Sequence, residues 1–134
     1  MSDRPHRAVR FLAARSEPLS DDRSRAVVEI EWTGSGSFTG TAEGGTARME
    51  ALRTVARAAA DAVSEATKAG GMSVRVRGIQ QIEVHGLEAV VVSLAALRDG
   101  KTKTLLGVCD GGEDRARAVA LAVLNATNRF LGVG

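Results

Sequence analysis

Residues 107–119, GVCDGGEDRARAV, join the end of a strand to the start of a helix. The apolar stretch before Asp110 is typical of a strand, and the Gly-Gly pair is typical of a tight turn. Residues 40–52, GTAEGGTARMEAL, repeat this order 67 positions earlier. At that separation Arg48 matches Arg115, Ala51 matches Ala118, Leu52 matches Val119, Ala59 matches Ala126 and Val63 matches Phe130. The chain is therefore predicted to contain two similar units.

A hairpin precedes each of these two joints. In residues 26–45 apolar and acidic side chains alternate, as they do in a half-buried strand, and TGSGS supplies the turn. In residues 87–110 the turn is Asp99-Gly100, which is the strongest short-range hairpin signal in the chain. The two hairpins place the glycine pairs at equivalent positions after the second strand of each hairpin.

Helical spacing of apolar residues follows each hairpin. The first predicted helix covers residues 46–71, with Thr46 as its N-cap, and the second covers residues 111–132. In the second helix Leu121, Leu124 and Leu131 fall off the main apolar stripe. A helix that is apolar on a second side is buried there as well, either by a sheet that curves around it or by a partner subunit. In the second case these three leucines form the interface of a homodimer.

One more strand is predicted ahead of each hairpin. Residues 72–86 alternate apolar and basic side chains, and Gly78 marks a bulge or bend. Residues 7–14 occupy the corresponding place in the first half, and the charged stretch at 15–25 reads as a loop. We therefore predict an α+β fold, in which a βββα–βββα duplication forms a two-layer sandwich with both helices on one face of a mostly antiparallel sheet.

Length and composition set the limits of this fold. The 134 residues suit a single domain, predicted over 7–132 with halves 7–71 and 72–132. The single cysteine allows no internal disulfide, and no apolar run is long enough to cross a membrane, so we expect a cytoplasmic protein. Fifteen Arg against three Lys are typical of a GC-rich bacterial genome.

Basic residues gather in two places. The N-terminal segment, residues 1–25, has six arginines against four acids. A basic stripe on a sheet can be formed by Arg75, Arg77, Arg98, Lys101 and Lys103. Association with nucleic acid through these groups is one interpretation. The other is a solvated arm that aids solubility for the N-terminal segment, and for the stripe a solvated face on which Glu83 and Glu88 balance the charge.

Catalytic signatures are not found in the sequence. Cys109 stands beside Asp110, whose charge opposes formation of a thiolate, and no motif supplies a base. His6 and His85 lack the neighbouring Cys and His residues that a zinc site needs. Acids at the start of the second helix repel phosphate but suit a ligand with an ammonium group. We predict no catalytic residue, no metal and no cofactor.

The second joint and helix resemble the C-terminal allosteric, dimerising domain of alpha-isopropylmalate synthase. The resemblance lies in a glycine pair, an acidic helix start and the pattern AxAxxxxxxNAxNRxL. It is carried by Gly107, Asp110, Gly111, Gly112, Asp114, Ala118, Asn125, Ala126, Asn128 and Arg129. In that family two βββα units bind leucine or a related amino acid between them and do no chemistry. The resemblance implies a non-catalytic dimerisation or regulatory module, whose partners are a second copy, another protein or an amino-acid-like ligand. The predicted ligand site combines the two joints: Gly44, Gly45, Gly111, Gly112, Glu113 and Asp114.

Overall fold

The structure is a computed structural model that describes residues 9–110 and 114–130. The elements follow the predicted order, which confirms the α+β class and the βββα–βββα duplication. They are β1 (Val9–Pro18), β2 (Arg23–Trp32), β3 (Gly36–Gly45), α1 (Arg48–Thr67), a 3-10 turn (Lys68–Gly70), β4 (Met72–Val84), β5 (Leu87–Arg98), β6 (Lys101–Asp110) and α2 (Arg115–Phe130). None of the helices in these ranges is long and apolar enough to span a membrane.

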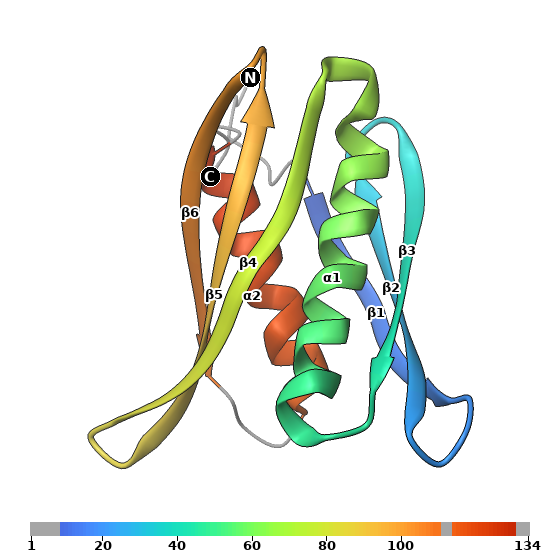
Figure 1. Cartoon of the computed structure of the whole chain (residues 1–134). Coiled ribbons are helices and arrows are strands. Elements are labelled where there is room, and N and C mark those ends of the chain that lie inside the picture. The colour runs from blue at the N-terminus through green and yellow to red at the C-terminus, as the bar shows by residue number, and fades with distance from the viewer. Residues whose placement is uncertain (1–8, 111–113, 131–134) are drawn as a thin grey trace.

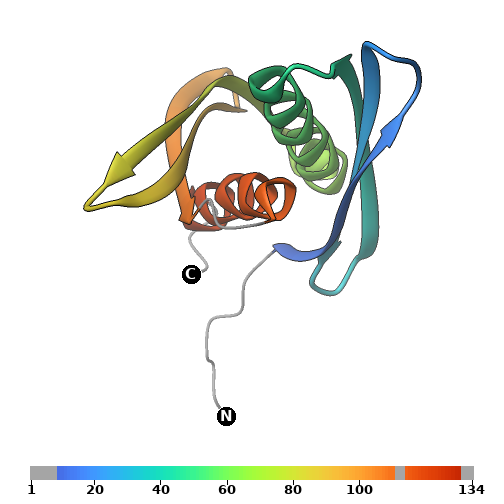
Figure 2. The same ribbon diagram turned by 90° about the horizontal axis from the view of Figure 1, so that it is seen from below.

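The strands form two separate antiparallel sheets, sheet A with the order β1-β2-β3 and sheet B with the order β4-β5-β6. The two helices lie between the sheets (Figures 1 and 2), and not on one face of a single sheet as the sequence led us to expect. Helix α1 packs on β3 and β2 of sheet A and on β4 of sheet B. Helix α2 packs on β6 and β5 of sheet B and on β1 of sheet A. Each helix therefore closes the gap between the two sheets on one side.

The first strand is longer than predicted, because the charged stretch after residue 14 does not form a loop. Strand β1 pairs with β2 as far as Pro18 opposite Ser24. Proline has no N–H to donate, but β1 is an edge strand and tolerates it. The loop is only four residues, and the backbone N–H of Leu19 closes it by donating to the Arg23 carbonyl at 2.9 Å. Most of the basic N-terminal segment is therefore part of sheet A.

The predicted hairpin turn at Asp99-Gly100 is confirmed, whereas the first helix does not begin at its predicted N-cap. Asp99 and Gly100 both have positive φ, 53° and 75°, as the predicted two-residue hairpin turn requires. Helix α1, however, starts after Ala47, which has no side-chain cap. The hydroxyl of Thr46, the predicted N-cap, instead donates to the Asp21 carbonyl at 3.4 Å.

A bulge marks the same point in both halves. In β4 the register shifts between Val76 and Gly78, which makes Arg77 the bulged residue and confirms the bend predicted at Gly78. In β1 the register shifts between Phe11 and Ala13, which makes Leu12 the bulged residue. The bulged residues, Leu12 of β1 and Arg77 of β4, are 65 positions apart. Equivalent residues of these two first strands are therefore separated by 65 positions.

Equivalent residues of α1 and α2 are 64 positions apart in the sequence. The predicted separation of 67 positions is therefore wrong for the helices. A Cβ atom on Gly40 of β3 would overlap the Ala58 carbonyl oxygen of α1. A Cβ atom on Gly107 of β6 would overlap the Ala122 carbonyl oxygen of α2. These strand glycines are indeed 67 positions apart, but the helix residues that they touch are 64 apart, since the second connection is shorter by three residues.

Candidate functional site

The predicted ligand glycines of the first joint serve to bring α1 close to β3. A Cβ atom on Gly45 would lie 2.7 Å from a carboxylate oxygen of Glu50, and one on Gly44 would overlap the Thr54 hydroxyl. A depression of about 270 Å³ adjoins this contact, lined by Gly44, Gly45, Met49, Glu50, Arg53, Thr54 and Arg57. The space that the two glycines leave is thus occupied by side chains of α1.

Of the predicted residues of the second joint, Gly111, Gly112 and Glu113 lie outside the described residues. Asp114 is described and caps α2: its Oδ1 accepts a hydrogen bond from the backbone N–H of Arg117 at 2.9 Å. A carboxylate in this position satisfies a free N–H of the first helical turn and complements the helix dipole. This contact explains Asp114 without a ligand.

Of the leucines predicted at a dimer interface, two lie within the described residues. Leu124 is 2% exposed and belongs to the core of the chain itself, so it has no surface to offer a partner. Leu121 is half-buried, and Leu131 lies outside the described residues. The second apolar side of α2 is explained at Leu124 by packing within the chain, because the helix lies between two sheets.

Nucleophiles and metal ligands are sparse in the part of the chain that the structure describes. Cys109 is half-buried and lies opposite Val90, on the helix side of sheet B. His85 is exposed in the turn after β4 with a φ of 52°. Within residues 9–110 and 114–130, no group of three or more His, Cys, Asp or Glu residues could hold a metal ion.

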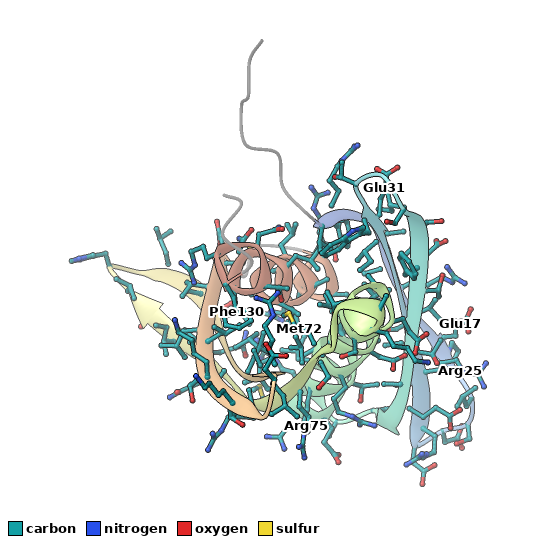
Figure 3. The ribbon with its side chains drawn as sticks, turned by 90° about the horizontal axis from the view of Figure 1, so that it is seen from above. Glu17, Arg25, Glu31, Met72, Arg75 and Phe130 are labelled. Carbon is teal, nitrogen blue, oxygen red and sulfur yellow. The ribbon has the colours of Figure 1, made fainter. Side chains whose placement is uncertain are left out.

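The outer face of sheet A, which points away from the helices, is covered by ion pairs. Arg10 and Glu31 are 3.0 Å apart, and Arg25 and Glu43 are 3.2 Å apart. Arg15 lies 3.2 Å from Glu17, and all of these side chains are substantially exposed. Figure 3 shows Glu17, Arg25 and Glu31 on the far side of sheet A from the helices. The arginines of the N-terminal segment within the described residues are therefore already paired with acids.

The outer face of sheet B carries an exposed apolar patch, with Gln80 and Asp110 beside it on the same face. Its exposed residues include Leu106 and Val108 of β6, each 55% exposed, and Leu87 of β5, 67% exposed. Ile82 and Val84 of β4 extend the patch across the sheet. We call these five residues, with Ala89 and Val91 between them, the apolar face of sheet B.

The two outer faces differ at equivalent positions. In sheet A, Arg25 of β2 lies opposite Glu43 of β3, and in sheet B, Ala89 of β5 lies opposite Asp110 of β6. Because β3 and β6 correspond at a separation of 67 positions, the middle strands β2 and β5 correspond at a separation of 64 positions. The charged residues of β2 are replaced by uncharged residues in β5: Arg23 by Leu87, Arg25 by Ala89, Glu29 by Ser93 and Glu31 by Ala95. Two polar residues of β3 are replaced by apolar residues in β6: Thr39 by Leu106 and Thr41 by Val108. These replacements are present in the sequence, but the equivalent positions can be matched only when the strand registers are known.

The basic residues of sheet B do not form one stripe. Arg98 and Lys103 lie against the Phe130 ring of α2, at 5.6 and 5.9 Å from its centroid. Arg75 points away from the helices (Figure 3). Glu88 does not balance these charges, because its carboxylate pairs with Arg115 at 2.9 Å near the opposite end of the sheet.

No family model matches the sequence of this chain, and no curated protein matches it. The resemblance to the regulatory domain of alpha-isopropylmalate synthase therefore rests on the quoted residues and on the βββα–βββα order of the elements. A shared fold does not establish a shared function.

Proposed function

We propose that this chain is a non-catalytic regulatory module that forms a homodimer through the apolar face of sheet B and binds a small amino-acid-like ligand. The observation that supports dimerisation is the contrast between the outer faces of two halves that otherwise share strand order, bulges and helix contacts. Exposed apolar patches on soluble proteins mark interaction sites. The resemblance to an amino-acid-binding, dimerising domain supports the regulatory role.

A second copy of the chain is the partner that this face fits. Two copies related by a twofold axis present the same apolar patch to each other, and sheets pack face to face through such surfaces. Three strands about 4.8 Å apart make a narrow face. Its area is at the low end of the range for specific interfaces, so we expect a dimer that dissociates on dilution.

Sedimentation velocity over a range of protein concentrations tests this proposal. We expect a species of twice the monomer mass of 14.0 kDa at high concentration. Leu106→Lys places a charge in the apolar face and should leave a monomer. Thr39→Lys adds the same charge at the equivalent position of sheet A and should leave the dimer intact. A monomeric unmodified protein, or equal loss of dimer in both variants, contradicts the proposed interface.

A further inference from the structure

One of the cross-strand pairs between the first and second strands differs in charge between the two sheets. In sheet A, Arg10 lies opposite Glu31 and the two side chains form an ion pair. In sheet B, Arg75 lies opposite Ala95. Each arginine stands two residues before the bulged residue of its strand, so the pairs are equivalent. The second half therefore keeps the arginine and replaces its carboxylate partner by a methyl group.

A depression of about 320 Å³ lies over this pair, lined by Arg75, Val76, Arg77, Ala95 and Thr102. The bulge of β4 contributes the second arginine, Arg77. Neither Arg75 nor Arg77 is in an ion pair within residues 9–110 and 114–130. Asp61 lines a neighbouring depression together with Arg75, but its Oδ2 accepts a hydrogen bond from the Thr41 backbone N–H at 3.2 Å. Two positive charges thus border one depression without an acidic partner.

We propose that this depression binds a small molecule with a carboxylate group, which takes the place that the Glu31 carboxylate has beside Arg10. A guanidinium presents two parallel N–H donors that fit a carboxylate, and Arg77 adds a second charge. The Thr102 hydroxyl can donate one more hydrogen bond. The methyl group of Ala95 suits a short apolar body on the ligand. The volume lies near the lower limit for ligand pockets.

This site supplies the ligand-binding part of the proposed function, on which the inference rests, but it does not require the dimer. Because both arginines are exposed, we expect weak binding, with a Kd of about 1 mM. Sodium acetate, L-leucine and sodium phosphate are suitable probes, with sodium chloride at the same ionic strength as the reference. Titrations followed by the backbone amide signals of Ala95 and Thr102 report on the site itself.

We expect saturable shifts with acetate and L-leucine and none with chloride. Ala95→Glu rebuilds the internal ion pair and should abolish these shifts, and Arg75→Gln should weaken binding about tenfold or more. The matched control, Arg10→Gln in sheet A, should bind as the unmodified protein does. Sedimentation of the same samples reports the dimer separately.

Four outcomes overturn the inference. Absence of saturable shifts at Ala95 and Thr102 with every carboxylate removes the site, and their absence from all backbone amide signals also removes the ligand-binding part of the proposed function. Carboxylate binding that survives in Ala95→Glu and Arg75→Gln removes this site but leaves a ligand elsewhere. Binding of phosphate as tight as that of acetate shows a general anion site and contradicts the carboxylate assignment. Equal weakening by Arg10→Gln shows a loss of overall charge and not of a site.

Discussion

The side-chain amide of Asn128 is hydrogen-bonded to both backbone polar groups of Val9. Its Oδ1 accepts from the Val9 N–H at 3.0 Å, and its Nδ2 donates to the Val9 carbonyl at 2.9 Å. In the other half, the Ser64 hydroxyl makes the same pair of contacts with Val74, accepting at 2.9 Å and donating at 3.2 Å. Each helix thus holds the first strand of the opposite half.

Replacing Asn128 by alanine should destabilise the domain. Val9 is 1% exposed, so the substitution leaves a buried N–H and a buried carbonyl without partners. We expect the free energy of unfolding to fall by about 2–4 kcal/mol, measured by urea denaturation. Asn125→Ala, at a half-buried position of the same helix, is the control and should change it by less than about 0.5 kcal/mol. Equal effects of the two variants contradict the role assigned to Asn128.

Alanine at Gly40 or Gly107 should separate a helix from its own sheet. The added methyl group meets backbone atoms of α1 or α2, which cannot rotate away as a side chain can. We expect each substitution to lower the free energy of unfolding by about 3 kcal/mol. Gly70→Ala is the control, because nothing lies within 4 Å of a Cβ atom there, and it should be neutral or slightly stabilising. Comparable losses at all three positions would show an effect of glycine replacement in general.

The sequence predicts the helices and strands better than it predicts which of them lie side by side. Period-2 alternation and Asp99-Gly100 identify the strands and their turn, since both signals are local. Alternation does not say which strand lies beside β4, so two sheets could not be distinguished from one. For the same reason the second apolar side of α2 could not be assigned, and Leu124 proved to be covered by the chain's own core. The candidate carboxylate site depends on cross-strand pairs, which only the registers reveal.

Helix caps offer a paired test in the two halves. Asp114→Ala removes a side-chain cap of α2 and should cost about 1 kcal/mol. Ala47 occupies the N-cap of α1 with an extended backbone, φ −58° and ψ 145°, and lacks a cap. Ala47→Ser adds one, with Glu50 three residues on to complete a capping box, and should raise stability by about 1 kcal/mol. Thermal unfolding followed by circular dichroism measures both changes, and a loss of stability in Ala47→Ser contradicts the cap geometry.

A carboxylate site should be transferable to sheet A. Glu31→Ala frees Arg10, and Leu12→Arg supplies a second arginine on the equivalent bulge. We expect this double variant to bind acetate at a second site, seen as saturable shifts of the amide at position 31. Loss of the exposed Arg10–Glu31 pair costs at most about 1 kcal/mol, so the fold should remain intact. Glu31→Ala alone is the control and should bind acetate less tightly, because it has one arginine. A folded double variant without acetate binding would show that an unpaired arginine pair on a bulge does not suffice.

Dimerisation should make thermal stability depend on protein concentration. A partner that binds only the folded chain raises its stability by mass action, so Tm should increase as the concentration rises. Val108→Lys, in the apolar face of sheet B, should remove this dependence, because a buried lysine without a partner opposes association. Thr41→Lys, its equivalent in sheet A, should retain it, since that face remains solvated in the dimer. Differential scanning calorimetry at matched concentrations gives the comparison. A Tm of the unmodified protein that does not change with concentration contradicts the dimer, whereas a dependence that survives in Val108→Lys moves the interface away from sheet B.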